Sequence, residues 1–189
     1  MRADEFVWRI RAAAPTEEDL RLQGYSAATI AEEARGYACP ARSGGAPEAD
    51  ALVDLVSRYD TTRLVIGFVE FNATDIPNAW LRPGRTIVAR WESDPIAVMQ
   101  GDGRVVLIDH ANPDSAYRLC AVDGSHFLDA MWRIFEFGRR HPYRPGQTPE
   151  DKAFVHGEAL KEVAMCAEAA GLATDAPNPY EELLGCGSR

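Results

Sequence analysis

Residues 91–137, WESDPIAVMQGDGRVVLIDHANPDSAYRLCAVDGSHFLDAMWRIFEF, decide the fold because they read without interruption as strands followed by a helix. An apolar run at residues 96–99 and a second one at residues 105–108 flank the turn-forming sequence Gln-Gly-Asp-Gly at 100–103. Two apolar runs that are joined by glycine-rich turn residues are typical of a β-hairpin. The centre of the stretch therefore predicts two antiparallel strands.

A third strand and a covering helix follow this hairpin. Residues 118–122 predict the strand, and Ser125 is predicted to cap the helix that begins after it. Apolar side chains recur at helical spacing along the helix and form one stripe that a core can bury. The stripe consists of Phe127, Leu128, Met131, Ile134, Phe135 and Gly138. The stretch as a whole predicts a sheet with a helix packed on it.

These residues resemble the C-terminal half of the SMI1/KNR4, or SUKH, superfamily. The resemblance rests on the strand entry Trp91, Asp94 and Pro95, the turn glycines Gly101 and Gly103, the strand end Asp109, and the helix start at residues 123–128. It extends upstream to residues 52–77, where an amphipathic helix runs into a strand. It includes neither the first 45 residues nor the chain after Gly138.

The resemblance implies an α+β domain that binds other proteins. In bacteria, such proteins most often neutralise a secreted nuclease or deaminase toxin, so it implies an immunity protein that acts by occlusion and uses no catalysis or cofactor. The eukaryotic branch of the superfamily implies an alternative, a regulatory or scaffolding adaptor with an endogenous partner. The gene neighbourhood would distinguish the two, since an immunity gene is expected directly downstream of a large toxin gene.

The rest of the chain predicts a single α+β domain with a mostly antiparallel sheet of about five strands. Residues 64–71 and 86–91 supply the two further strands, and the first is apolar on both faces, which predicts a place near the middle of the sheet. Helices from the N- and C-terminal parts pack against this sheet. We expect a helical extension at residues 1–45, the SUKH-like core at 46–140, and a helix with a loose tail at 141–189, all packed as one unit.

Several local expectations accompany this division. Ser26 is predicted to cap a helix that ends at Gly36, because glycine is common where a helix stops in a left-handed conformation. Phe68 is expected in the core with Phe71. The acidic, proline-bearing tail from Asp175 onward is expected to be loosely held.

Composition excludes several classes of protein. The chain has 189 residues, of which 46% are hydrophobic and 26% charged, and this is ordinary globular composition. It contains no apolar run of membrane-spanning length and begins with early acids instead of a secretory signal, so we expect a cytoplasmic protein without a membrane partner. The cysteines are scattered and without metal-ligand spacing, so we expect reduced thiols and no metal site. They are Cys39, Cys120, Cys166 and Cys186.

The net charge of −9 argues against direct binding of nucleic acid, because such proteins use clustered cations on the phosphates. The acid excess lies in residues 1–60 and 141–189. An acidic surface suits a basic protein partner, such as a toxin domain, since complementary potentials speed association. Solubility alone is the alternative explanation for the same charge.

The candidate partner-binding residues are acids in or near predicted loops and one aromatic residue. They are Asp75, Glu92, Asp94, Asp102 and Trp132, the last of which lies one position away from the buried stripe of its helix. A small hydrolase that uses His110, His126 or Cys120 is the less favoured alternative, since no nucleophile motif surrounds these residues.

Overall fold

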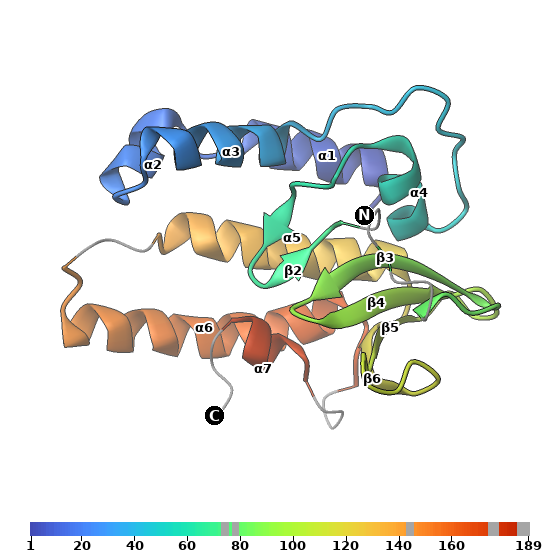
Figure 1. The fold of residues 1–189 in the computed structure, drawn as a ribbon. Helices are drawn as coiled ribbons and strands as arrows, with labels where there is room; N and C mark the ends of the chain where they lie inside the picture. The colour runs from blue at the N-terminus through green and yellow to red at the C-terminus, as the bar shows by residue number, and fades with distance from the viewer. Residues whose placement is uncertain (73–75, 77–79, 143–145, 174–177, 185–189) are drawn as a thin grey trace.

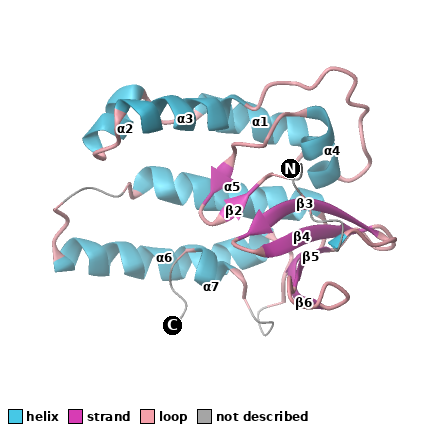
Figure 2. Cartoon of the chain, viewed as in Figure 1, coloured by secondary structure: helices cyan, strands magenta, loops and turns pink. Residues whose placement is uncertain are grey.

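The computed structural model describes residues 1–72, 76, 80–142, 146–173 and 178–184. They form one α+β domain, in which a six-stranded antiparallel sheet in the order β1-β2-β3-β4-β5-β6 lies against a group of helices (Figures 1 and 2). Every strand pairs with its neighbour in sequence, so the sheet is a meander. The predicted fold class is confirmed, with one strand more than expected.

The strands follow one another between residues 65 and 121. They are β1 (Val65–Ile66), β2 (Val69–Glu70), β3 (Arg85–Trp91), β4 (Asp94–Met99), β5 (Val105–Ile108) and β6 (Ala116–Ala121). Four of these segments correspond to strands that the sequence predicts. A β-bulge between Ile87 and Ala89 in β3 places Val88 and Ala89 together in the main core.

Helices precede and follow the sheet. They are α1 (Ala3–Ala12), α2 (Glu17–Leu22), α3 (Ala27–Ala38), α4 (Ala51–Arg58), α5 (Gly124–Arg140), α6 (Pro149–Ala169) and α7 (Tyr180–Leu183). Among the described residues, no helix combines the length and the apolar composition that crossing a bilayer requires.

The main core lies between the sheet and the helices α1, α4 and α5. Phe6 of α1, Phe71 beside β2 and Phe127 of α5 form a chain of rings, with centroid distances of 6.1 Å and 6.5 Å, and all three are fully buried. Burial of such side chains stabilises a fold by about 2–3 kcal/mol each. The N-terminal helix therefore contributes to the same core as the sheet.

Residues 64–71 do not form one central strand, as the sequence predicts, but a tight hairpin at the edge of the sheet. Gly67 adopts a positive φ of 59°, a conformation that glycine accepts without strain, and it turns the chain between β1 and β2. Ile66 and Val69 point into the core, while Val65 and Phe68 are 48% and 49% exposed. The expectation that Phe68 is a core residue is therefore wrong.

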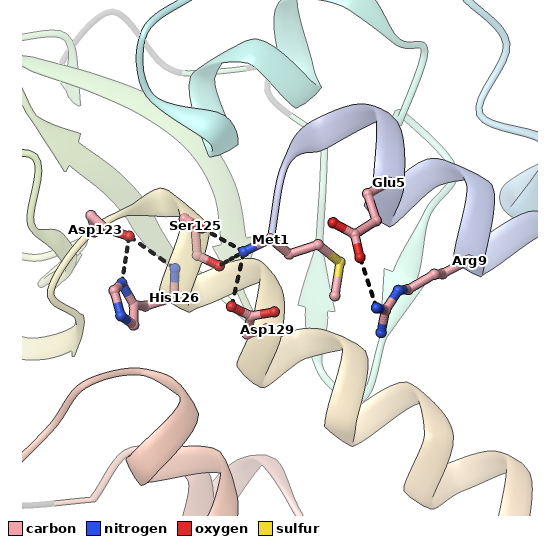
Figure 3. A network of polar contacts seen from close by, with 7 residues as sticks. All are labelled: Met1, Glu5, Arg9, Asp123, Ser125, His126 and Asp129. Carbon is pink, nitrogen blue, oxygen red and sulfur yellow. Dashed lines mark hydrogen bonds and ion pairs between the residues drawn. The ribbon is translucent and has the colours of Figure 1, made fainter.

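The start of α5 also differs from the prediction. Asp123, not Ser125, is the N-cap, and its carboxylate accepts a hydrogen bond from His126 N–H at 2.9 Å. The backbone oxygen of Ser125 accepts a hydrogen bond from the ammonium group of Met1 at 3.1 Å, and Asp129 forms an ion pair with the same group at 2.9 Å (Figure 3). These contacts join the start of α1 to α5.

The side chain of Asp50 connects the N-termini of α4 and α5. Its Oδ1 accepts hydrogen bonds from the N–H groups of Leu52 (2.9 Å) and Val53 (3.1 Å), and its Oδ2 accepts one from Gly124 (3.0 Å). Helix N-termini carry unpaired donors and a partial positive charge, so one carboxylate stabilises two helices. A Cβ at position 124 would collide with this carboxylate and would lie 2.7 Å from Leu52 N, which explains the glycine.

Two other local predictions differ from the structure. The helix α3 does not end at Gly36 but continues to Ala38, and Gly36 is buried against the backbone of Arg63, where there is no room for a Cβ. The described part of the tail, residues 178–184, is anchored and not loosely held, because Tyr180 is fully buried and its hydroxyl donates to Cys120 O of β6 at 2.7 Å. Residues 174–177 and 185–189 lie outside the described part of the chain.

A buried carboxylate joins α5 to α6. The side chain of Glu162 is only 2% exposed, and its two oxygens accept hydrogen bonds from Arg133 (3.0 Å) and Arg140 (2.7 Å). Both arginines keep contact with solvent, so their charge compensates the buried acid at a moderate desolvation cost. The pair of long helices is therefore held in one register.

We expect Asp50→Ala to lower the free energy of unfolding by about 3 kcal/mol, because it removes the acceptor of three backbone N–H groups, and a lost cap alone costs about 1 kcal/mol. Urea denaturation monitored by circular dichroism measures this loss. Asp151→Ala is the matched control, since the Asp151 carboxylate serves the capping box of α6 only and should cost about 1 kcal/mol. Equal losses for the two variants would contradict the double role of Asp50.

Candidate protein-binding surface

The described residues form a groove between the N-terminal helices and the edge of the sheet. It has a volume of about 250 Å³ and is lined by residues of α2 and α3, of β1, and of the C-terminal end of α5. Figure 1 shows how the helices α2, α3 and α5 are arranged. Its lining includes Leu20, Tyr25, Glu33, Tyr37, Val65, Ile66, Gly67, Ile134, Phe135 and Arg139. We call it the hairpin groove, because the β1–β2 hairpin forms one wall.

Exposed apolar side chains gather at the hairpin groove. Val65 and Tyr25 line it and are 48% and 42% exposed, and Phe68 extends from the adjoining turn of the hairpin. The alternation of strand side chains produces this arrangement, since Ile66 and Val69 take the core positions and leave their neighbours outside. Large apolar side chains beside a concave surface mark interaction sites more often than isolated ones do.

Acids accompany these apolar side chains. Asp19 belongs to the capping box of α2, where hydrogen bonds from the backbone and the hydroxyl of Thr16 lower its pKa. Its carboxylate also lies 3.7 Å from the guanidinium of Arg139. Glu33 accepts a hydrogen bond from the Tyr37 hydroxyl at 3.1 Å, and burial together with this carboxylate raises the pKa of Tyr37. The hairpin groove is therefore lined by both apolar and charged side chains.

Two of the candidate acids, Glu92 and Asp94, lie at the same end of the sheet as the turn of the β1–β2 hairpin. Val69 of β2 pairs with Trp91 of β3, so the next residues, Phe68 and Glu92, lead into adjacent turns. Glu92 is exposed and has a positive φ of 53° in the β3–β4 turn. Asp94 follows it at the start of β4. Phe68 and the β3–β4 turn thus lie at one end of the sheet, and the hairpin groove lies on the β1 side of the same hairpin.

The other selected residues lie elsewhere. Asp102 is in the β4–β5 turn at the opposite end of β4, where it pairs with Arg104 at 2.6 Å. Trp132 is partly buried against the main core, with its ring 5.6 Å from that of Phe135 and under the guanidinium of Arg9. Asp75 lies outside the described residues. The five candidates therefore do not form one site.

Among the described residues, Asp94, Asp109 and His110 form the group whose ligand atoms lie close enough for a metal ion, all within 4.8 Å of one another. Asp94 Oδ1 already accepts a hydrogen bond from His110 N–H at 3.0 Å and lies 2.6 Å from His110 Nδ1. Because these contacts satisfy the groups without an ion, the cluster by itself does not indicate a metal site.

The three residues of the hydrolase alternative are separated from one another. His126 Nδ1 lies 2.8 Å from Asp123 at the start of α5 (Figure 3), and His110 lies beyond β5. Cys120 is buried in β6, where loss of hydration raises the pKa of its thiol to about 12. None of the three lines the hairpin groove.

Sequence reasoning missed the residues of the hairpin groove. The glycine at position 67 inside an apolar run is the signal that could have revealed the β1–β2 turn. Because the chain turns there, Val65 and Phe68 are exposed. No signal in the sequence places Tyr25 and Phe135 near one another.

Comparison of the chain with models of protein families, with curated proteins and with solved structures found no match. The likeness to the SUKH superfamily therefore rests on the motif residues of the sheet and of α5 alone.

We expect the thiols of Cys39, Cys120 and Cys166 to resist alkylation by iodoacetamide at pH 8 in the folded protein, because burial raises their pKa values to about 11, 12 and 12. Unfolded thiols lose their protons near pH 9, so proton release favours the unfolded chain above that pH. The urea midpoint should therefore fall as the pH rises from about 9 to about 11.

Peptide mass spectrometry after labelling and urea titrations at several pH values test both statements. Cys39→Ala, which lacks one of these thiols, should show a shallower decline with pH. Rapid labelling of the native protein, or a midpoint that does not change above pH 9, would contradict the burial of these thiols.

Proposed function

We propose that the chain is a non-enzymatic protein-binding module that resembles SUKH immunity proteins and neutralises a nuclease or deaminase toxin domain in the cytoplasm by covering its surface. The observation that carries the proposal is the hairpin groove, with the exposed side chains of Phe68 and Glu92 at the adjoining end of the sheet. The α+β fold is also the fold class that the resemblance implies.

The apolar part of this surface supplies affinity. A few large side chains carry most of the binding energy of an interface, and they do so best where the surface lets a partner exclude water around them. Phe68 and Val65 stand beside a concavity, so an apolar side chain of the partner can enter the hairpin groove while Phe68 packs against its surroundings.

The acidic residues of this surface determine which partners can bind. Asp19 and Glu33 line the hairpin groove, Glu92 is exposed at the same end of the sheet as Phe68, and the chain as a whole has a net charge of −9. A basic partner surface is attracted to this field at a distance and is guided to the apolar contact, whereas an acidic partner is repelled. The partner we propose is therefore a basic toxin domain with an apolar side chain at its contact surface.

Occlusion of an enzyme by such a surface requires no reactive group on this chain. An interface near 1,600 Å² in total would cover an active site of ordinary size and can reach nanomolar or tighter affinity. The hairpin groove occupies only the centre of such an area, so neighbouring turns contribute to it.

Coexpression tests the proposal directly. The gene product encoded immediately upstream in the native host, or its basic C-terminal domain, is produced in a sensitive bacterium with and without this chain. We expect growth only in the presence of the chain, and a stable complex of the two purified proteins. Absence of a toxin from the neighbourhood, or a complex with an endogenous protein instead, would contradict the immunity function and favour the adaptor.

We expect Phe68→Asp to weaken binding of that toxin domain by more than 30-fold, because it replaces an apolar anchor by a desolvated charge in the contact. Glu92→Lys should mainly slow association and reduce its dependence on salt. Surface plasmon resonance at two salt concentrations separates the two effects. Leu81→Asp, a change of another exposed apolar residue remote from the hairpin groove, is the control and should bind normally.

A further inference from the structure

The hairpin groove contains a carboxylate, that of Glu33, whose charge is not compensated. Among the described residues that line the groove, Asp19 and Glu33 are the acids and Arg139 is the base. The guanidinium of Arg139 lies 3.7 Å from Asp19, so these two charges offset each other. In the described part of the chain, no arginine, lysine or histidine forms an ion pair with Glu33. The groove therefore has an excess of one negative charge.

The position of the Glu33 carboxylate is fixed by aromatic neighbours. Glu33 and Tyr37 lie one turn apart on α3, and the Tyr37 hydroxyl donates to Glu33 Oε2 at 3.1 Å. The Tyr37 ring is in turn held against Phe135 of α5, with a centroid distance of 5.6 Å and an edge-on angle of 61°. No described residue donates to the second oxygen, Oε1. One oxygen thus orients the group, and the other is left for a ligand.

This environment favours a cation. Glu33 is only partly exposed to solvent, and a carboxylate that is partly withdrawn from water attracts a positive charge more strongly than a fully exposed one. The rings of Tyr25 and Tyr37 line the same groove, and the faces of aromatic rings also attract cations. A cationic group that enters the groove is therefore stabilised by the carboxylate and by the rings.

The apolar lining determines which kind of cation fits. Val65, Ile134 and Phe135 line the groove, so a small hydrated ion would lose water there without gaining contacts. A long basic side chain has methylene groups that pack on such a surface while its charged end reaches the carboxylate. Arginine suits the site better than lysine, because its planar guanidinium stacks on aromatic rings and donates several hydrogen bonds in a fixed geometry.

We propose that the hairpin groove binds an arginine side chain of the basic partner, with the guanidinium paired to Glu33 and the methylene stem on the apolar lining. This inference rests on the proposed function, since it names the contact by which the groove recognises that partner. The arginine lies beside the apolar contact made by Val65 and Phe68 and does not replace it. Glu33 is then the residue that selects a cationic partner side chain over an uncharged one.

A titration followed by nuclear magnetic resonance tests the arginine site without the toxin. The probe is N-acetyl-arginine methylamide, added up to about 50 mM to the ¹⁵N-labelled full chain at low salt, since salt screens the pairing. We expect it to shift the amide resonances of Tyr25, Glu33 and Tyr37 with a dissociation constant on the order of 1 mM. The matched N-acetyl-citrulline methylamide, which has the same shape without the charge, should bind at least fivefold more weakly.

A pair of variants locates the site. Glu33→Gln keeps the shape of the side chain and removes its charge, so it should weaken arginine binding at least fivefold. Glu18→Gln makes the same change at an exposed position of α2 outside the groove lining and should bind as the unchanged chain does. The resonance spectrum itself verifies that both variants are folded.

Several results would overturn the arginine site. They are no shift at the highest arginine concentration, equal binding of the citrulline compound, or equal binding by the two variants. Groove resonances that shift with protein concentration instead would assign the groove to a second copy of this chain.

The outcomes also separate this site from the immunity function. Arginine binding by a chain that rescues no toxin-producing cell would keep the site and remove the immunity function. Full rescue by Glu33→Gln, together with no response to arginine, would keep the immunity function and remove the site.

Discussion

The Asp50 carboxylate is the contact on which the arrangement of the helices depends. It accepts hydrogen bonds from backbone N–H groups at the start of α4 and from the first residue of α5, although Asp50 and Gly124 are 74 positions apart in the chain. Because Gly124 must come within hydrogen-bonding distance, no side chain is tolerated there. The short helix before the sheet and the long helix after it are thereby brought to one point above the strands.

From that point α5 determines the positions of the hairpin groove and of α6. Its first half covers the sheet through Phe127 and Met131, and its last turns carry Ile134, Phe135 and Arg139 into the hairpin groove. On its other side, Arg133 and Arg140 hold Glu162 and so position α6. The groove at the sheet edge and the placement of α6 therefore both depend on one helix that contacts two groups of neighbours.

The sequence predicts elements well where the information is local. The strands around residues 96–108 and the helix after Asp123 follow from apolar runs, turn glycines and helical periodicity. Contacts between distant segments explain the errors. The Asp50 bridge, the close approach of Gly36 to Arg63 and the burial of Tyr180 each depend on a partner that no local pattern identifies. The candidate surface is only partly predictable from the sequence. Glu92 is selected by its position in a loop. Phe68 is assigned to the core, because the sequence analysis does not recognise the turn at Gly67.

The bond from the Tyr180 hydroxyl to the backbone of β6 has a consequence for how the sheet meets other chains. An open sheet offers backbone donors and acceptors at both outer strands, and these can recruit strands of neighbouring molecules into fibrous aggregates. Here the last strand is covered, because Tyr180 binds Cys120 O and the end of α6 accepts a hydrogen bond from Val122 N–H. The first strand, β1, has only two residues and is interrupted by a glycine turn. Addition of strands from other molecules is therefore hindered at β6 by the C-terminal segment, which contacts that strand. At β1 it is hindered because the strand is only two residues long.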